Sequence, residues 1–452
     1  MSIAPCARSE GVLSQYFRCP DDLLSISAPL SLNGQKGFFR FGEESICYGR
    51  CEGQAAERPS GTIPDTLSQV TFSEPGCRLT FDLDEIVDNL RLEKYQQHAP
   101  DRDVLPALSG FYYLARPLVP KRLRRLVQRL YLRDWSKIPF PRWPVDTTVD
   151  DLLRRCLGLA MKARAVDRLP FIWFWPKGHR ACAIVTHDVE TEAGLKQCET
   201  LMDLDDSNGI KASFQLVPEG RYEVSFRTLS AIKDRGFEVN VHDLNHDGLL
   251  YKNYDEFLKR ARQINMYGQA FGAAGFRAGV LYRNPAWYDA LDFLYDMSIP
   301  NVGHLEAQRG GCCTVMPFFI RHILELPLTT TQDYSLFYML KTSSISLWKK
   351  QAASILDCNG LISFNSHPDY LFQDGNWESY VELLVYLARL QSTRRVWLTT
   401  PGEVNRWWRR RNCMRLVAGG TGYQIEGPGC DQAEIAYAVL RDDEVKFEYE
   451  AC

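Results

Sequence analysis

Between about residues 171 and 411, short apolar runs alternate with stretches whose apolar residues recur at helical spacing. The runs, rich in β-branched residues, predict strands, and the intervening stretches predict helices, a pattern typical of βα units around a parallel sheet. Seven or eight such units predict an α/β fold that closes into a barrel. We expect strands at residues 182–186, 212–217, 237–241, 273–276, 298–302, 323–328, 361–365 and 396–399. We expect helices at residues 225–235, 255–266, 285–295, 344–356 and 377–390.

The two ends of the chain have a different pattern. Residues 1–60 predict a β-rich accessory unit, because short apolar runs are broken by Asn-Gly and Gly turn signals. Residues 61–170 predict a helical and extended linking region, and residues 171–411 the barrel. Residues 412–452 predict a second β-rich segment. A segment of about 40 residues rarely supports a core alone, so we expect it to pack with the N-terminal unit.

Residues 116–134 (RPLVPKRLRRLVQRLYLRD) predict a basic amphipathic helix. Leu123, Val127 and Leu130 form one face, and arginines line another. The favoured interpretation is a solvated helix packed on the next domain. Peripheral contact with a membrane surface, or with an anionic lipid-linked glycan, stays open.

Composition and charge restrict the class of protein. Of 452 residues, 45% are hydrophobic and 24% are charged, which is ordinary globular composition with apolar material for two or three domains. The net charge of −3 provides no basic field that would favour nucleic acid. No apolar run reaches the roughly 18 residues of a transmembrane helix, and the first residues lack the pattern of a secretion signal. The 14 cysteines lack the spacing of a structural zinc site, so we expect free thiols and a cytoplasmic location. The oligomeric state stays open.

Residues 181–190 (ACAIVTHDVE) carry the first candidate chemistry. An apolar, β-branched run leads directly into His187, Asp188 and Glu190. This pattern predicts a buried strand whose C-terminal end holds carboxylates and an imidazole in fixed positions.

Residues 80–84 (TFDLD) resemble that motif only superficially. Residues 73–76 (SEPG) stand where a buried strand should lead in, and Asp82 precedes a periodic apolar run containing Ile86 and Leu90. We therefore predict that Asp82 is a helix N-cap.

Later predicted strands also end in polar side chains. His242 and His246 follow one strand in VHDLNHDG, Arg277 follows the next in GFRAG, and His367 follows a late one in FNSHPDY. Two histidines four residues apart can face one metal ion, and together with one carboxylate they leave open positions for water, as catalytic zinc requires. A second carboxylate could take a proton from that water, and a separate histidine could protonate the leaving group.

Taken together and in this order, the motifs THDVE, HDLNH, FRAG and FNSHP resemble the polysaccharide deacetylases (NodB-homology, carbohydrate esterase family 4). The resemblance covers residues 180 to 400. It implies a distorted (β/α)7-type barrel, to which the N- and C-terminal β-rich segments are additions. It also implies a metal ion, usually zinc, held by an Asp-His-His triad, and removal of N- or O-acetyl groups from sugars.

The resemblance also implies a role for each matching residue. Asp188 matches the catalytic base, and Arg277 the arginine that orients it. His242 and His246 match the two metal histidines, and His367 matches the general acid. We interpret His187 as structural, and the aromatic residues 171–175 as packing.

The match has departures. Val189 stands where the familiar motif has a second aspartate, so the third metal ligand is either Glu190 or Asp188 itself. Ala278-Gly279 replace the proline expected shortly after the arginine, and nothing in the sequence around His367 indicates what tunes its pKa.

We therefore predict a metal-dependent hydrolase, most simply with Zn²⁺, that removes an acetyl group from an N-acetylated sugar or glycan precursor. One alternative is a catalytically inactive carbohydrate-binding barrel, which the departures at Val189 and after Arg277 favour. The other is an amidohydrolase that acts on a non-sugar amide.

Overall fold

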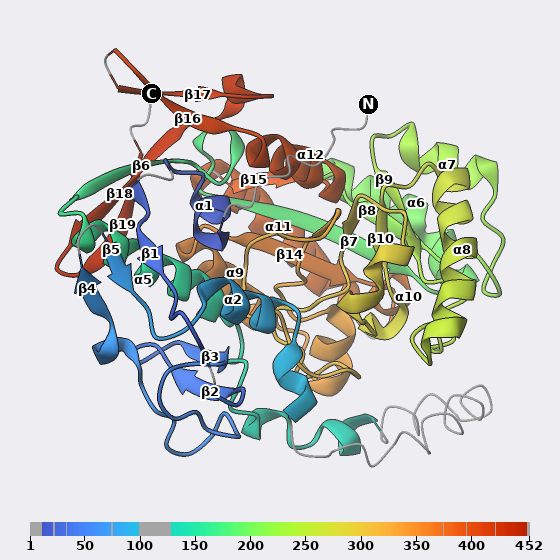
Figure 1. Ribbon diagram of the computed structural model, residues 1–452. Coiled ribbons are helices and arrows are strands. Elements are labelled where there is room, and N and C mark those ends of the chain that lie inside the picture. The colour runs from blue at the N-terminus through green and yellow to red at the C-terminus, as the bar shows by residue number, and fades with distance from the viewer. Residues whose placement is uncertain are drawn as a thin grey trace.

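The computed structural model describes residues 11–20, 23–32, 34–73, 76–98, 128–373, 375–394, 396–420 and 422–449. Its centre is one curled nine-stranded sheet with the order β12-β13-β11-β10-β9-β8-β7-β14, to which β15 adds by pairing with β7 (Figure 1). Every pair is parallel except β12 with β13. The strands are β7 (Ala181–Val189), β8 (Ser213–Leu216), β9 (Glu238–His242), β10 (Gly275–Arg277), β11 (Tyr295–Asp296), β12 (Phe318–Ile320), β13 (Ile323–Glu325), β14 (Leu361–Ser366) and β15 (Val396–Thr399).

Helices follow most of these strands and cover the outer side of the sheet, with α6, α7 and α8 grouped beside β8 and β9 (Figure 1). Their ends follow from local sequence: the Asn253 side chain accepts from the backbone N–H of Glu256 (2.9 Å) where α8 begins, and Gly272 takes a left-handed conformation where it ends. The helices are α6 (Glu192–Ser207), α7 (Phe226–Lys233), α8 (Tyr254–Phe271), α9 (Ser346–Asp357), α10 (Pro368–Leu371), α11 (Asn376–Arg394) and α12 (Pro401–Asn412).

Threonine side chains bridge the interval between the chain after β13 and strand β14. The Thr329 hydroxyl donates to the carbonyl of Leu361 (2.7 Å) and accepts from the N–H of Ser363 (2.8 Å). The Thr330 hydroxyl donates to the carbonyl of Ser363 (2.8 Å). The sheet curls round on itself here, and side-chain hydrogen bonds supplement the backbone pairing where its two sides meet. The predicted α/β barrel of distorted type is confirmed.

Most predicted strands and helices of the barrel form within a few residues of their expected bounds, but one stretch was predicted wrongly. The strand expected at 298–302 instead forms earlier, as β11, and the helix expected at 285–295 is reduced to a 3-10 segment, Pro285–Ala290. The physical reason lies after Asp296, whose carboxylate accepts from the N–H (2.8 Å) and hydroxyl (2.9 Å) of Ser298 and interrupts the strand. Beyond this turn, the described residues 298–302 form only a single parallel bridge, between Pro300 and Leu328.

The N-terminal part of the chain forms small sheets and helices beside the barrel. Asp82 is the N-cap of α2, where its carboxylate accepts from the N–H of Glu85 (3.0 Å), so the predicted cap is confirmed. The elements are α1 (Val12–Phe17), β1 (Ile26–Ser27), β2 (Gly37–Arg40), β3 (Ile46–Gly49), β4 (Thr71–Ser73), β5 (Gly76–Arg78), α2 (Leu83–Arg91), α5 (Thr148–Ala163) and β6 (Arg168–Ile172).

One of the C-terminal strands, β18, pairs with β6, which spans the predicted boundary between the linking region and the barrel. The C-terminal strands are β16 (Arg415–Gly419), β17 (Gly422–Glu426), β18 (Ile435–Arg441) and β19 (Glu444–Tyr449), and β18 lies between β6 and β19. Phe447 also contacts Phe17 of α1 and Phe171 of β6, with ring centroids 5.8 and 5.1 Å apart. The two ends of the chain are thus close together, although their strands belong to separate sheets; the domain boundaries themselves stay predictions.

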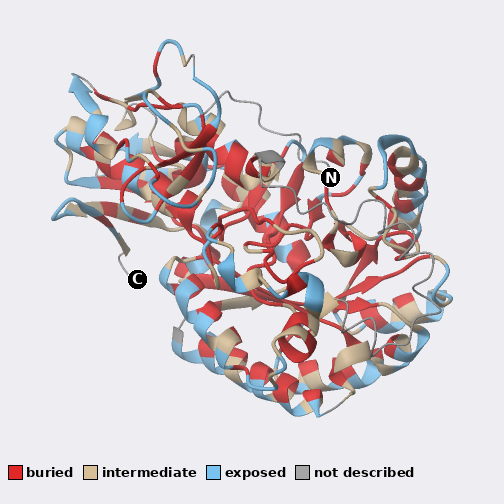
Figure 2. Ribbon diagram, turned by 90° about the horizontal axis from the view of Figure 1, so that it is seen from below, coloured by how far each residue is buried: buried red, intermediate tan, exposed pale blue. Residues whose placement is uncertain are grey.

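Buried residues form two continuous regions, visible as the red ribbon in Figure 2. One lies between the sheet and its outer helices. The other joins the N-terminal elements, β6, the C-terminal strands and the amino ends of β7 and β14. The aromatic residues Phe171, Trp173, Phe174 and Trp175 are buried in the second region, as the interpretation of residues 171–175 as packing expects.

Residues 116–127 of the predicted basic helix lie outside the described residues, and residues 128–132 are helical. None of the described helices has the length and apolar character to cross a membrane. The 12 cysteines in the described part of the chain are free thiols. The predicted cytoplasmic location stays a prediction.

We predict that Arg411→Ala destabilises the whole fold. Arg411 is 2% exposed, and its guanidinium donates to backbone carbonyls of Tyr16, Phe17, Ile172 and Trp173, at 2.7 to 3.3 Å. Alanine leaves these carbonyls without a donor, so the free energy of unfolding should fall by about 3 kcal/mol.

Urea denaturation of the full chain checks this prediction. Arg415→Ala is the control, because Arg415 is exposed and pairs only with exposed Glu426. Equal denaturation midpoints for Arg411→Ala and the parent chain would contradict the proposed role of Arg411.

Candidate active site and metal centre

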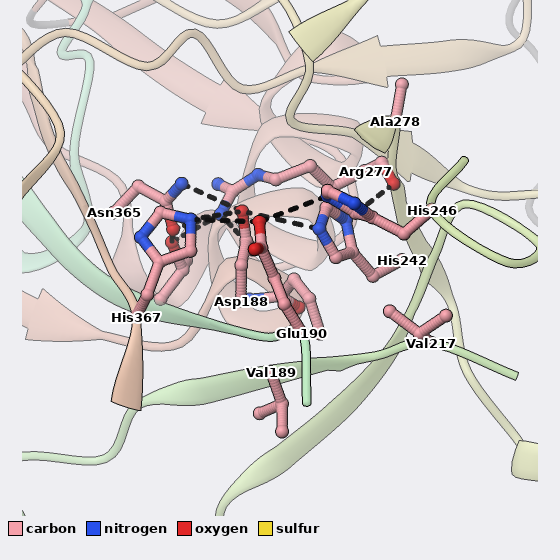
Figure 3. Close-up of polar contacts among 12 residues, drawn as sticks. Asp188, Val189, Glu190, Val217, His242, His246, Arg277, Ala278, Asn365 and His367 are labelled. Carbon is pink, nitrogen blue, oxygen red and sulfur yellow. Dashed lines mark hydrogen bonds and ion pairs between the residues drawn. The ribbon is translucent and has the colours of Figure 1, made fainter. Parts of the chain in front are cut away.

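Strand β7 places two carboxylates on one side of the sheet. Side chains alternate along a strand, so Asp188 and Glu190 point the same way and Val189 points the other way, as Figure 3 shows. Val189 is fully buried, and its carbonyl accepts a hydrogen bond from the hydroxyl of Tyr222 (2.6 Å). The valine that departs from the familiar motif therefore occupies a core position, and the next residue is the one that faces the site.

Asp188 is buried and is held from both sides. Arg277, at the end of β10, donates from Nη1 to Oδ1 (2.9 Å), and Asn365, near the end of β14, donates from Nδ2 to Oδ2 (2.8 Å). Burial by itself raises the pKa of Asp188, but Arg277, followed by His242 and His367, lowers this pKa to about 2. The carboxylate is therefore ionised throughout the neutral range.

His242, His246 and Glu190 form a cluster with the composition of a metal site. Their donor atoms all lie within 4.8 Å of one another. His246 Nε2 lies 3.0 Å from Glu190 Oε1, yet it is not aligned for a hydrogen bond, and His242 Nε2 is buried with no hydrogen-bond partner among the described residues. Ligands of one tetrahedral zinc ion are separated by about 3.4 Å. Two unsatisfied ring nitrogens beside a carboxylate therefore fit a divalent cation.

The backbone fixes the orientation and tautomer of His242. Its Nδ1 lies 3.1 Å from the carbonyl oxygen of Arg277, and a carbonyl can only accept, so the proton is on Nδ1 and the Nε2 lone pair faces the cluster. Burial lowers the pKa of His242 to about 4, which keeps the ring neutral near pH 7. A neutral imidazole is the form that binds a metal ion.

Gly279 allows the loop after β10 to approach the histidine loop. A Cβ at this position would lie 2.4 Å from Oδ2 of Asp243 and 3.1 Å from Cδ2 of His246. The preceding Ala278 donates its N–H to the hydroxyl of Ser298 (2.9 Å). Proline at 278 would lose that bond, and any larger residue than glycine at 279 would collide. The loop after β10, which lacks the proline expected after Arg277, is therefore closely packed in a conformation of its own.

His367 is paired with a buried carboxylate that no motif indicated. Asp333 Oδ1 accepts from His367 Nδ1 (2.6 Å), and its Oδ2 accepts from the His367 backbone N–H (2.7 Å). Burial by itself lowers the pKa of His367, but Asp333, followed by Glu190 and Asp188, raises this pKa to about 10. His367 Nε2 lies 3.8 Å from Asp188 Oδ2 and 3.6 Å from Glu190 Oε1. The ring is thus a charged donor that faces both carboxylates.

His187 points away from this cluster. It is fully buried and contacts Ser366, Asp205 and Tyr380 on the outer side of β7, with Nδ1 3.0 Å from the Ser366 hydroxyl and Nε2 3.2 Å from Asp205. These contacts agree with the interpretation of His187 as a structural residue.

A cavity of about 830 Å³ opens beside the cluster and is lined by Glu190, His246 and His367. Tyrosines and glutamines supply much of the remaining wall: Tyr131, Tyr334, Tyr370, Gln128, Gln197, Gln332 and Gln373. Gln128 and Tyr131 precede the barrel in the chain. The linking region therefore contributes to the cavity.

The structure brings together all six residues predicted from the motifs, listed as Asp188, Glu190, His242, His246, Arg277 and His367 (Figure 3). Sequence reasoning missed Asn365 and Asp333. The signal for Asn365 was its spacing: it lies two residues before His367, as its neighbour on the same face of the extended chain. Asp333 lies at the start of a short helical segment, 34 residues from His367, and no pattern connects the two.

Comparisons with solved structures list several that are similar to part of this chain. A protein from Mycobacterium smegmatis assigned as a polysaccharide deacetylase matches with a TM-score of 0.40 and 17% identity, over 53% of this chain and 93% of that one. The allantoinase PuuE matches with a TM-score of 0.40 and 13% identity, over 52% and 92% of the two chains. A family 4 acetyl xylan esterase from Clostridium thermocellum, solved with a cobalt ion, matches with a TM-score of 0.32 and 14% identity, over 50% and 91%. No family model matches the chain, and no curated protein matches its sequence.

We predict that the protein binds one divalent ion per chain and that His242→Ala loses it. The substitution removes one of two buried ring nitrogens that have no hydrogen-bond partner among the described residues, and affinity should fall by about 100-fold or more. Elemental analysis and calorimetric titration with Zn²⁺ measure both effects. His322→Ala is the control, because His322 contacts the Leu291 carbonyl on another part of the surface. Full metal occupancy in His242→Ala would contradict the assignment.

We also predict that Asp333→Asn lowers the pKa of His367 in the metal-free protein. Asparagine keeps the shape of the side chain but removes the negative charge that stabilises the imidazolium. The titration of His367, followed by NMR of the ring protons, should therefore move from about 10 toward the range of an ordinary histidine. Asp357→Asn, at an exposed position, provides the control. An unchanged titration would mean that Asp333 does not set the pKa of His367.

Proposed function

We propose that the protein is a metal-dependent hydrolase that removes the acetyl group from an N-acetylated sugar or glycan precursor. The observation that carries the proposal is a cluster of two histidines and one carboxylate next to two ionisable groups whose charges are fixed by separate partners. Asp188 is held anionic by Arg277, and His367 is held cationic by Asp333. Hydrolysis of an amide requires a base for water and an acid for the departing amine, and these two groups lie 3.8 Å apart, between Asp188 Oδ2 and His367 Nε2.

His242, His246 and Glu190 would hold the metal ion, which we expect to be Zn²⁺. A bound ion of this kind polarises a carbonyl oxygen and lowers the pKa of water toward neutrality. Glu190 is better suited than Asp188 as the third ligand, because both oxygens of Asp188 already accept hydrogen bonds from Arg277 and Asn365.

Asp188 would accept the proton of the attacking water through Oδ2, the oxygen that faces His242 and His367. Its low pKa makes it a weak base toward free water. Toward a water molecule whose own pKa lies near 7, a weak base is sufficient. Arg277 keeps the carboxylate in place by donating from one nitrogen to Asp188, Thr186 and Asn365 at 2.8 to 2.9 Å.

His367 would give its proton to the departing nitrogen. Asp333 binds Nδ1 and thereby directs Nε2 into the cavity, where the leaving group would lie. The pKa of about 10 keeps His367 protonated before the reaction begins, and transfer becomes favourable as the amine nitrogen becomes basic.

The walls of the cavity favour a sugar over an apolar amide. Tyrosine rings provide flat surfaces on which a sugar ring can stack, and the glutamine amides both donate and accept hydrogen bonds to hydroxyls. Tyr334 and Tyr370 lie 5.2 Å apart between ring centroids, and Tyr370 lies 4.9 Å from the ring of His367. A barrel that only binds a carbohydrate needs neither an anionic Asp188 nor a cationic His367. The presence of both beside the cluster therefore favours an enzyme.

We predict that the metal-loaded protein releases acetate from a member of a panel of N-acetylated sugars, and that a chelator abolishes this release. Asp188→Asn should lower kcat by about 100-fold or more, because it removes the base. It should retain the metal ion, which separates loss of the base from loss of the site. Asp443→Asn, at an exposed position paired with Lys162, is the matched control. Acetate release by Asp188→Asn at the parent rate would refute the mechanism, and release undiminished by chelation would refute metal dependence.

A further inference from the structure

A buried carboxyl group in the wall of the cavity has no part in the mechanism above. Glu306 is 7% exposed and lines the cavity with Leu305, Gln332 and Tyr334. One of its oxygens, Oε2, accepts a hydrogen bond from the side-chain amide of Gln332. The other, Oε1, accepts no hydrogen bond from any residue that the structure describes. Because Glu306 lines the cavity, this oxygen can accept a hydrogen bond from a ligand that enters it.

The position of Glu306 is connected to the general acid. Gln332, which holds Glu306, directly precedes Asp333, which holds His367. The positive charge of His367 is also among the influences on the pKa of Glu306. A substrate group that binds Glu306 would therefore lie on the same wall of the cavity as His367.

The loop that carries Glu306 is anchored before any ligand arrives. Its ends are joined by a hydrogen bond from the N–H of Gly303 to the carbonyl of Gly310 (2.6 Å). Within it, the amide of Gln308 accepts from the N–H of Arg283 (3.0 Å) and donates to the Arg283 carbonyl (3.1 Å). Arg283 is in turn paired with buried Glu93. A site on an anchored loop loses little entropy on binding, which suits a recognition residue.

The wall facing the solvent end of this site is polar as well. The Tyr334 hydroxyl donates to the side-chain carbonyl of Gln128, which belongs to the helical residues 128–132 before the barrel. Glu306, Gln332, Tyr334 and Gln128 thus form a continuous row of hydrogen-bonding groups along the cavity. Such a row matches the hydroxyls of a sugar better than an apolar chain.

We infer that Glu306 is a specificity-determining residue, whose free carboxyl oxygen accepts a hydrogen bond from the sugar hydroxyl next to the acetamido group. This inference rests on the proposed deacetylase function and names the part of the substrate that the cavity recognises. A substrate lacking the neighbouring hydroxyl would leave this oxygen without its donor.

The test uses short N-acetylglucosamine oligomers and an analogue in which the hydroxyl next to the acetamido group is replaced by hydrogen. Glu306→Ala should raise KM for the parent sugar by about tenfold or more and leave kcat within about threefold. Glu306→Gln, which keeps an acceptor oxygen, should recover part of the loss. Glu426→Gln, at an exposed position, should match the parent protein.

The analogue identifies the hydroxyl. The parent protein should bind it about tenfold more weakly than the complete sugar, whereas Glu306→Ala should not distinguish the two. Equal losses on both sugars in Glu306→Ala, or an unchanged KM, would overturn the inference.

A binding experiment separates this inference from the proposed function. Calorimetric titration of Asp188→Asn with the same oligomers needs no turnover. Binding by Asp188→Asn that is lost in the double variant with Glu306→Ala supports the recognition role, even if the parent protein releases no acetate and the proposed reaction fails. Binding that is equal in the two proteins, or undetectable in both, overturns the inference while acetate release by the parent protein upholds the reaction.

Discussion

Asp188 and Glu190 lie two residues apart at the end of β7, where the fold removes their carboxylates from most contact with water. A carboxylate loses much of its hydration on burial, so it persists as an anion only where cations and donors surround it. Arg277 and Asn365 meet this requirement for Asp188. Around Glu190 the charged partners are histidines, with the Tyr370 hydroxyl as a further donor, and the ring nitrogens of His242 and His246 that lack a hydrogen bond leave room for a metal ion. The surrounding strands can be understood as the means of bringing these groups to one end of the barrel.

The parts of the chain outside the barrel support that arrangement and add to it. The N-terminal helix, β6 and the C-terminal strands share one buried core with the amino ends of β7 and β14, opposite the site. The linking region reaches the cavity itself, where Gln128 and Tyr131 form part of the wall. The accessory segments therefore both stabilise the barrel and shape what can enter it.

Spacing along the chain predicted most of the site, because local backbone geometry controls where these side chains point. Residues two apart on a strand face the same side of the sheet, so the spacing of Asp188 and Glu190 predicted that their carboxylates lie together. His242 and His246 are close in sequence but meet differently: His242 ends β9, and His246 lies in the loop that follows it. Arg277 and His367 were predicted from their places at strand ends, which a parallel barrel brings to one rim. By contrast, the strand expected at 298–302 was wrong, because the turn that Ser298 makes with Asp296 is a side-chain contact that no periodicity encodes.

The sequence by itself determined the class of fold, the strand ends that carry chemistry, and the identity of six residues at the site. These follow from periodicity and from short-range spacing, which are properties of the chain alone. Only the tertiary structure decided that Asp333 sets the pKa of His367, that Glu190 rather than Asp188 forms a cluster with both His242 and His246, and that Glu306 lines the cavity. The reason is distance along the chain. Asp333 and His367 are separated by a helix and a strand, and the contact between them exists only because β13 and β14 both end at the same rim of the barrel.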